Sequence, residues 1–126
     1  MIERPLNKRK LGEKQEQQAV NFLVKKNFKI IDRNWHWSNK GEIDIVAIDP
    51  KRFGKEYYVF IEVKYRSMSM SMSLYALNPK KIEQLQTLAQ VYLLQKGINP
   101  NSVNISFDFI AIHQNQIEHI ENFLSL

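Results

Sequence analysis

The chain has 126 residues, of which 44% are hydrophobic and 25% charged, proportions typical of a soluble globular protein with one domain over residues 1–126. It contains no cysteine, which excludes disulfides and thiolate metal sites, and its net charge of +5 is compatible with a nucleic-acid partner. No run approaches the roughly 20 apolar residues of a membrane span and no secretory signal is visible, so we expect a cytoplasmic protein with no membrane partner.

The first half of the chain shows one helical pattern and three strand patterns. Apolar residues recur at helical spacing from about residue 7 to residue 27. Three segments rich in β-branched and aromatic residues follow, separated by a turn at 38–41 and by a connection at 50–55 that contains Pro and Gly. The patterns predict strands at 28–37, 42–49 and 57–66.

The second half begins with a low-complexity segment, "SMSMSMS" at 67–73, whose composition favours a mobile connector. A second helix is predicted behind Asn78, because Asn followed by Pro79 is a typical helix start and Gly97 is a typical helix end. A strand at 103–112 and a short last strand, "IEHI", complete the order α-β-β-β-α-β-β. We therefore predict an α/β fold with a central mixed sheet flanked by helices on both faces.

Three of these elements place charged side chains on faces that are otherwise apolar. In the strand 42–49, alternation puts Asp44 on an apolar face. The opposite face of that strand is formed by Ile43, Ile45 and Ala47. In the next strand, Glu62 and Lys64 are two residues apart and therefore point to the same face. In the first helix, Glu16 lies on the stripe that faces the sheet.

Such inward charges require a compensating partner. Burying an ion costs several kcal/mol even after relaxation, and three neighbouring carboxylates repel one another and raise one another's pKa. One explanation is an ion pair between Lys64 and one carboxylate, with the other carboxylates at the wet end of the sheet. The other is a divalent cation, Mg²⁺ or Mn²⁺, which binds carboxylate oxygens, acidifies a bound water and stabilises charge on a phosphate. Carboxylates with a nearby ammonium group are what metal-assisted phosphodiester hydrolysis needs.

The spacing of these residues resembles that of a known group of enzymes. Asp44, followed 18 residues later by Glu62-Val63-Lys64, resembles the D…(D/E)-x-K signature of restriction-endonuclease-like nucleases. A wider pattern is formed by "GEKQEQQAVNFL", "RNWHWSNKGEIDIVA", "VFIEVKYR", "NPKKIEQLQTLAQVYL", "FDFIAI" and "IEHIENF". With these segments the chain resembles, from Lys10 onward, the small YraN-like family of uncharacterised bacterial proteins.

The resemblance implies a fold and roles for particular residues. The fold is a restriction-endonuclease-like α-β-β-β-α-β core, similar to that of archaeal Holliday-junction resolvases. Asp44 and Glu62 correspond to the metal ligands, and Lys64 corresponds to the group that positions water or phosphate. Glu16 corresponds to the helical carboxylate of the catalytic set. The family commonly has glycine where this chain has Gln15, so a feature that allows close backbone approach is missing here.

Cations near these residues are candidates for contact with nucleic acid. Arg66 continues the face of Glu62 and Lys64, where a phosphate contact and a solvated strand end are alternatives. Lys80 and Lys81 lie in the first turn of the second helix, where the macrodipole disfavours cations. A phosphate bound there would account for both lysines, and a solvent-exposed turn is the alternative.

The remaining aromatic and polar residues near the turn at 38–41 have less specific interpretations. Trp35 and Trp37 share one face of a strand, which favours packing over stacking on an unpaired base. Glu42 lies on the face of Asp44, either as an outer ligand or as a solvated residue. The three histidines, His36, His113 and His119, show no zinc-ligand spacing.

The leading hypothesis is a Mg²⁺- or Mn²⁺-dependent nuclease that acts on DNA, including branched or structured substrates. Cutting of a junction would favour a two-fold homodimer. The rival hypothesis is a non-catalytic nucleic-acid-binding module that retains the nuclease fold. A third is a protein-interaction adaptor that uses "SMSMSMS" and the two tryptophans.

Overall fold

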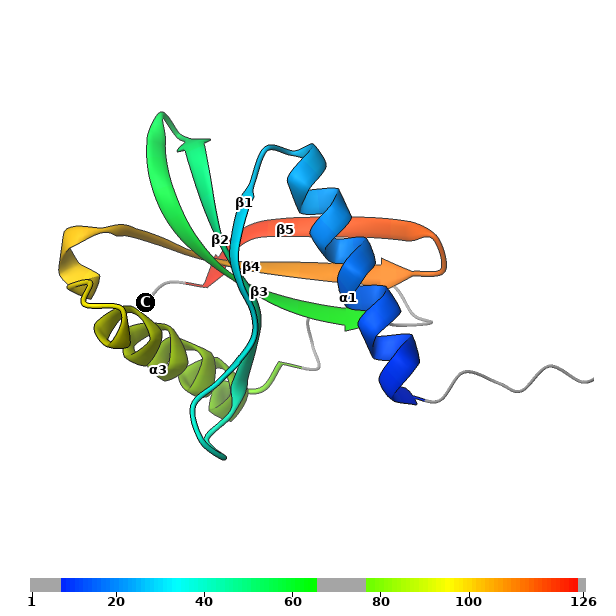
Figure 1. Cartoon of the computed structure of the whole chain (residues 1–126), viewed down its shortest axis with the longest axis horizontal. Helices are drawn as coiled ribbons and strands as arrows, with labels where there is room; N and C mark the ends of the chain where they lie inside the picture. The colour runs from blue at the N-terminus through cyan, green and yellow to red at the C-terminus, as the bar shows by residue number, and fades with distance from the viewer. Residues whose placement is uncertain (1–7, 66–76, 125–126) are drawn as a thin grey trace, which may run out of the picture.

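The computed structural model describes residues 8–65 and 77–124 and shows an α/β arrangement of two helices and a five-stranded sheet within them (Figure 1). In chain order the elements are α1 (Lys8–Lys25), β1 (Lys29–His36), β2 (Glu42–Arg52), β3 (Lys55–Tyr65), α3 (Pro79–Gln95), the short 3₁₀ helix η1 (Pro100–Ser102), β4 (Asn104–His113) and β5 (Gln116–Leu124). This confirms the predicted order. Arg66 and the segment "SMSMSMS" lie outside the described residues. Neither described helix has the length and apolar character needed to cross a membrane.

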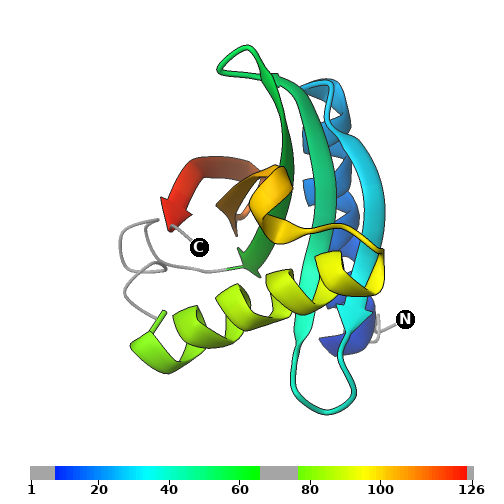
Figure 2. The same cartoon turned by 90° about the vertical axis from the view of Figure 1, so that its left-hand side faces the viewer.

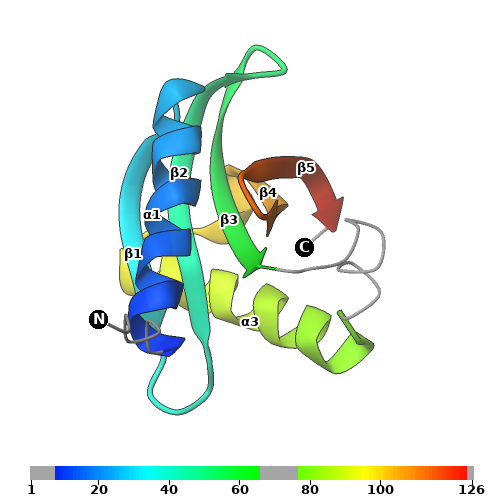
Figure 3. The ribbon, with the colours of Figure 1, turned by 90° about the vertical axis from the view of Figure 1, so that its right-hand side faces the viewer.

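The sheet is mixed, as predicted. Its strands lie in the order β1-β2-β3-β4-β5, and every neighbouring pair is antiparallel except β3 and β4. Parallel neighbours need a crossover connection, and α3 lies in that connection. The two helices cover opposite faces of the sheet (Figures 2 and 3).

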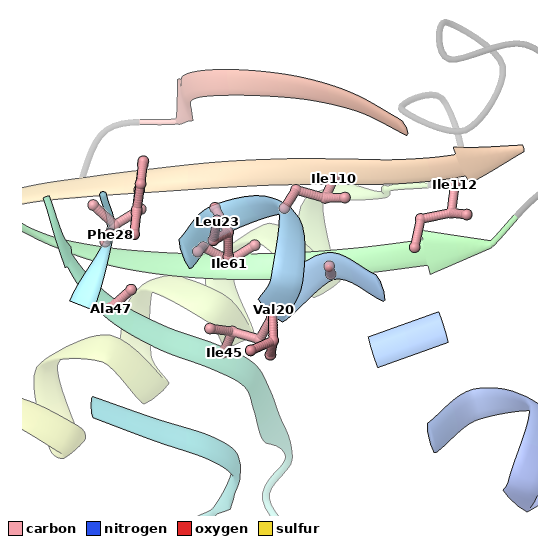
Figure 4. Close-up of a cluster of buried hydrophobic side chains, with 10 residues drawn as sticks. Val20, Leu23, Phe28, Ile45, Ala47, Ile61, Ile110 and Ile112 are labelled. Carbon is pink, nitrogen blue, oxygen red and sulfur yellow. The ribbon is translucent and has the colours of Figure 1, made fainter. Parts of the chain in front are cut away.

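The core on the α1 face joins three positions of the helix to three central strands (Figure 4). Its fully buried members include Leu23 of α1, Ile45 of β2 and Ile61 of β3. Burial of each side chain of this size stabilises the fold by about 1.5–3 kcal/mol. The spacing of the apolar residues in α1 therefore fixes the helix across the middle of the sheet.

The core on the α3 face is built from larger side chains than the core on the α1 face. Helix α3 contributes five buried residues, Leu85, Leu88, Ala89, Tyr92 and Leu93. They pack against Val46 of β2, Phe60 of β3 and Phe107 of β4. Trp35 and Trp37 pack against the same core, and Trp35 meets the ring of Tyr92 edge-on at 5.3 Å. Packing of the two tryptophans on one face is confirmed.

Local signals decide where the helices end. The side chain of Asn78 accepts a hydrogen bond from the backbone N–H of Lys81 at 2.9 Å, which caps α3 as predicted. At the other end Gly97 adopts φ +75°, a left-handed conformation that glycine takes without strain. Asn27 adopts the same left-handed conformation after α1, with φ 70°, and ends that helix.

The hairpin between β2 and β3 is tighter than predicted. The sequence pattern placed residues 50–55 in a connection, but β2 continues to Arg52 and β3 begins at Lys55. Pro50 is accommodated near a shift of register between Asp49 and Arg52. The prediction was wrong because Pro and Gly suggested a connection, whereas Pro50 and Arg52 remain in β2, where the side chain of Arg52 is only 2% exposed.

Arg52 ends in a buried polar cluster on the α1 side of the sheet. Its guanidinium donates to both oxygens of Asp108, at 2.9 and 2.7 Å, and to Oγ of Ser106 at 2.6 Å. Nε2 of His119 lies 2.7 Å from Asp108 Oδ2. The ammonium of Lys26 lies 2.8 Å from His119 Nδ1 and can only donate, so Nδ1 accepts and Nε2–H donates to Asp108.

Candidate active site

Strands β2 and β3 stop pairing with each other at the position of the predicted site. Their last registered pair is Ile45 with Ile61. Beyond it, β2 stays paired with β1 as far as Glu42, while β3 stays paired with β4 as far as Tyr65. Figure 3 shows the two strands diverging toward the β1–β2 turn. We call this divergence, from the Ile45–Ile61 pair onward, the fork.

Asp44 bridges the fork with its side chain. The backbone N–H of Val63 donates a hydrogen bond to Asp44 Oδ2 at 2.8 Å. A carboxylate of β2 therefore contacts the backbone of β3 where strand pairing has ended. The contact places the Asp44 carboxylate against the backbone of Val63, the residue that lies between Glu62 and Lys64 in the sequence of β3.

The alternation predicted for β2 fails next to Asp44. Ile45 packs in the core on the α1 face, as expected, but Ile43 packs in the core on the α3 face. Ile43 pairs with Trp35 and Ile45 with Arg33, and the residue between those partners, Asn34, has φ 50°. Because a left-handed residue interrupts the extended backbone of β1, the paired side chains on its two sides do not share a face.

The Asp44 carboxylate lines a cleft of about 320 Å³ between α1 and the fork. Glu16 from α1 and Glu42 from the start of β2 line the same cleft, together with Asn34 and Tyr65. The structure thus brings Glu16 to Asp44, although 28 positions separate them in the sequence. Glu42 also lies 2.7 Å from Nε2 of His36, so it has a partner at the rim.

Glu16 is held in a fixed orientation by β1. Its Oε1 accepts hydrogen bonds from Nε of Arg33 at 3.2 Å and from Nδ2 of Asn34 at 2.9 Å. The side chain of Glu16 is 13% exposed. Sequence reasoning did not identify Arg33 and Asn34 as its partners, because the pairing depends on how α1 crosses β1.

Glu62 points to the α3 side of the sheet. It is 4% exposed, and its Oε1 lies 3.2 Å from Nζ of Lys64 and 3.8 Å from Nζ of Lys81. The ion pair between Glu62 and Lys64 that the sequence left as one alternative is therefore present. Lys81 is an additional partner contributed by α3. The side chain of Lys64 remains 33% exposed and accessible to a ligand.

The carboxylates at the fork interact strongly through their charges. Burial raises the pKa of the Asp44 carboxyl to about 8, and the negative charges of Glu62 and Glu42 add to the increase. The hydrogen bond from Val63 opposes the increase without cancelling it. Nearby positive charge is therefore insufficient to balance the ionised form of Asp44.

This imbalance predicts a gain in stability when the charge is removed. Asp44 has an ordinary pKa of 3.8 and a raised pKa in the fold, so it contributes most stability below pH about 4 and loses it as the pH rises to about 8. Asp44→Asn should be more stable than wild type at pH 9 by about 1–3 kcal/mol, with little difference at pH 4. Urea unfolding at pH 4, 7 and 9 measures this.

The exposed carboxyl of Glu56 provides the matched control for that prediction. Glu56→Gln also removes one negative charge, but from a solvated position on β3. Its stability should follow the wild-type pH profile. If Asp44→Asn gave the same profile as well, the proposed electrostatic imbalance at the fork would be refuted.

The donors at the fork fit a hard divalent cation. Within residues 8–65 and 77–124, no three His, Cys, Asp or Glu side chains form a ready-made metal cluster. Mg²⁺, however, is commonly held by one or two carboxylates together with waters and substrate phosphate. Asp44 is such a carboxylate, and Glu62, whose charge acts on it, is a second one, although the Glu62 side chain points to the α3 side and does not line the cleft of Asp44.

Comparison with known proteins connects this geometry to a family. The family model described as "Uncharacterised protein family UPF0102" matches residues 15–112, which is most of the chain. The chain belongs to the UPF0102 family. The matched span includes Glu16, Asp44, Glu62 and Lys64. The resemblance to the YraN-like family that the sequence segments indicated is thereby confirmed.

Individual members of the UPF0102 family are similar to this chain over most of their length. The UPF0102 protein of Carboxydothermus hydrogenoformans is 36% identical over 124 residues, which cover 94% of this chain and 98% of that protein. The UPF0102 protein of Acetivibrio thermocellus is 35% identical over 108 residues, 85% of this chain and 78% of that protein. A UPF0102 protein of Francisella tularensis subsp. novicida is 36% identical over 113 residues, covering 89% and 92%.

The candidate nucleic-acid contacts of this UPF0102 chain lie on the α3 side. Lys80 and Lys81 line a second cleft, of about 550 Å³, beside the first turns of α3. Lys81 also approaches Glu62 and so belongs to both regions. The contact predicted for Arg66 stays a prediction, since that residue lies outside the described part of the chain.

Proposed function

We propose that this UPF0102 protein is a Mg²⁺- or Mn²⁺-dependent nuclease that hydrolyses phosphodiester bonds of DNA, including branched or structured DNA, in the cytoplasm. The observation that carries the proposal is the arrangement at the fork, where Asp44 lines a cleft with Glu16 and accepts a hydrogen bond from Val63, the residue between Glu62 and Lys64. Burial and the charge of Glu62 raise the pKa of Asp44, which agrees with this arrangement. Burial and repulsion from neighbouring carboxylates disfavour the ionised form of Asp44 unless a positive charge is added. Such an arrangement is typical of functional sites.

Asp44 and Glu62 are the residues that would hold the cation. A bound divalent cation supplies a more acidic water and stabilises negative charge on a phosphate. Asp44 is oriented for this role by the hydrogen bond from Val63. Glu62 is oriented by Lys64 and Lys81.

Lys64 is the group that would contact the phosphate. Its side chain is one-third exposed and its ammonium lies 3.2 Å from Glu62, so it can approach an oxygen of a phosphate bound beside that carboxylate. An ammonium in this position stabilises the charge that develops on phosphorus during hydrolysis. Glu16, fixed by Arg33 and Asn34, borders the same cleft as Asp44 and completes its acidic wall.

One observation supports a second candidate function. Glu62 already has two cationic partners, Lys64 and Lys81, so its charge is compensated without a metal ion. This favours a non-catalytic nucleic-acid-binding module in which the cluster serves only the fold. The two functions differ in metal binding: the nuclease must bind Mg²⁺ at the fork, whereas the module need not.

Cleavage and metal binding can be tested on the full chain. The protein is incubated with linear, nicked and four-way DNA in Mn²⁺, Mg²⁺ or EDTA, and calorimetry measures its affinity for Mg²⁺. We expect cleavage that requires a divalent cation and a Mg²⁺ affinity that Asp44→Asn removes. If all three DNAs remain intact and Mg²⁺ does not bind, the nuclease proposal is wrong. Sedimentation with the four-way DNA tests whether two copies bind a symmetrical junction.

A further inference from the structure

The cleft beside α3 combines an aromatic surface with ammonium groups. It has a volume of about 550 Å³ and lies between the β1–β2 turn and the first half of α3. Figure 2 shows α3 crossing in front of the hairpin that carries this turn. The residues used below are Trp37 and Lys40 from the turn, and Lys80, Lys81 and Gln84 from the helix. We call this volume the α3 cleft.

The two walls of the α3 cleft are fixed to each other. Nε2 of Gln84 donates a hydrogen bond to the backbone carbonyl of Lys40 at 2.7 Å. Gly41 adopts φ +139°, and a Cβ at this position would lie 2.6 Å from Nε2 of Gln84. The turn thus packs directly on the helix, and the cleft is formed in the free protein. A ligand would bind it without first ordering the turn.

The chemistry of the walls is that of a nucleotide site. The indole of Trp37 packs on the core and also lines the cleft. Three lysines line the cleft as well, against one carboxylate, that of Glu83. An aromatic ring beside cations is the combination that binds single-stranded nucleic acid, since the ring stacks on a base and the cations neutralise phosphates. Bases within a duplex are already stacked and do not present a face to a side chain.

The position of Lys81 connects the α3 cleft to the candidate active site. Its Nζ lies 3.8 Å from Glu62 Oε1, while its side chain lines the cleft. A strand bound in the cleft therefore runs next to Glu62 and to Lys64, whose ammonium is itself 3.2 Å from Glu62.

We infer that the α3 cleft binds an unpaired nucleotide of a DNA strand, with the base on Trp37 and the flanking phosphates on Lys40 and Lys80. Together with the proposed nuclease function, on which this step rests, the inference implies that the substrate carries a single-stranded segment next to the cleaved bond. DNA with a flap or an open branch point is such a substrate. Continuous duplex DNA is not.

Fluorescence of a single tryptophan tests the stacking directly. Trp35→Phe leaves Trp37 as the sole tryptophan, and Trp37→Phe leaves Trp35, which packs edge-on against Tyr92. Each protein is titrated in EDTA with an oligo-dT of about 12 nucleotides. We expect quenching in the protein that retains Trp37 and no change in the protein that retains Trp35. Equal responses of the two proteins would overturn the inference.

Affinity measurements separate stacking from charge. Trp37→Ala should weaken oligo-dT binding by roughly 5- to 150-fold and leave binding of a duplex of the same length unchanged. Lys80→Ala should reduce the dependence of binding on salt, by about 0.7 in the logarithmic slope. Lys51→Ala, an exposed lysine near the β2–β3 turn, is the control and should keep the wild-type slope. Thermal melts confirm that each variant is folded.

The binding and cleavage assays test the two proposals independently of each other. Because the titrations are done without a divalent cation, they require no turnover. If Mn²⁺-dependent cleavage occurs and Trp37→Ala binds oligo-dT as well as wild type, the inference about the α3 cleft is wrong and the nuclease proposal stands. If binding depends on Trp37 and no DNA is cut, the cleft is confirmed and the nuclease proposal is wrong.

Discussion

Replacing Lys64 by alanine is expected to lower the rate of metal-dependent DNA cleavage by roughly 10²- to 10³-fold, the effect of losing one preorganised group that stabilises transition-state charge. The fold should persist, because Glu62 keeps Lys81 as an ion-pair partner at 3.8 Å. Single-turnover cleavage of the four-way DNA at saturating Mn²⁺ measures the chemical step separately from DNA binding.

Lys55→Ala is the matched control for this prediction. Lys55 lies at the opposite end of the same strand and is exposed, so its loss removes an equal charge away from the fork. It should cleave at the wild-type rate. A Lys64→Ala protein that is folded and as active as Lys55→Ala would remove Lys64 from the mechanism. Asp44→Asn should also be inactive while being more stable, a combination that general damage to the fold does not produce.

Replacing Asp108 by asparagine is expected to lower the free energy of unfolding by about 3–5 kcal/mol, since it removes the fully buried counter-charge of the Arg52 guanidinium and leaves only the more exposed carboxylates of Asp49 and Glu121. The Asp108 side chain is fully buried and the Arg52 side chain is 2% exposed, so water cannot replace the lost interaction. The melting temperature should fall by about 10 °C or more. Urea unfolding at pH 7 measures the free-energy change.

The pKa of the Asp108 carboxyl predicts that the protein loses stability in acid. Burial alone would raise the pKa of Asp108, but the hydrogen bonds from His119, Arg52, Asn122 and Ser106 outweigh it and hold the pKa well below its ordinary value. A lowered pKa means that Asp108 stabilises the fold above pH about 4 and that this contribution disappears as the pH falls further. Wild type should therefore lose its advantage over Asp108→Asn progressively as the pH falls below about 4.

A double substitution tests whether the charge pair causes the effect. In Arg52→Met with Asp108→Leu both charges are absent, and replacing a buried pair by apolar groups is often close to neutral. The double variant should be more stable than Asp108→Asn. If it were less stable, shape rather than charge would account for the loss. The coupling between the two positions follows from the corresponding double-mutant cycle.

Features that depend on neighbours in the chain were predictable. Asn78 and Pro79 begin α3 and Gly97 ends it, because caps satisfy backbone groups within one turn. The apolar stripe of α1 marked the face that meets the sheet. Asp44 and Glu62 were recognisable as carboxylates within apolar strands, since a strand that buries a charge without a reason is unstable.

Features that depend on distant partners were not predictable. Asp108 interrupts the apolar run "VNISFDFIAI" just as Asp44 interrupts its strand, but its partner Arg52 is 56 positions away. Lys81 meets Glu62 only because α3 returns across the face of β3. The face of Ile43 was predicted wrongly, since alternation assumes a continuous pleat and Asn34 interrupts the neighbouring strand.

The sequence by itself determined the order of the elements, the ends of α3, and the identity of the carboxylates and the lysine that mark the site. Each of these features depends on a short stretch of chain: a helix cap, the periodic spacing of apolar residues, or a charged residue among apolar ones. Only the tertiary structure decided that the sheet forks beside Asp44, that Glu62 turns toward Lys81, and that Trp37 borders a cationic cleft. Those outcomes depend on which strands pair and how helices cross them, and residues far apart in the chain set both.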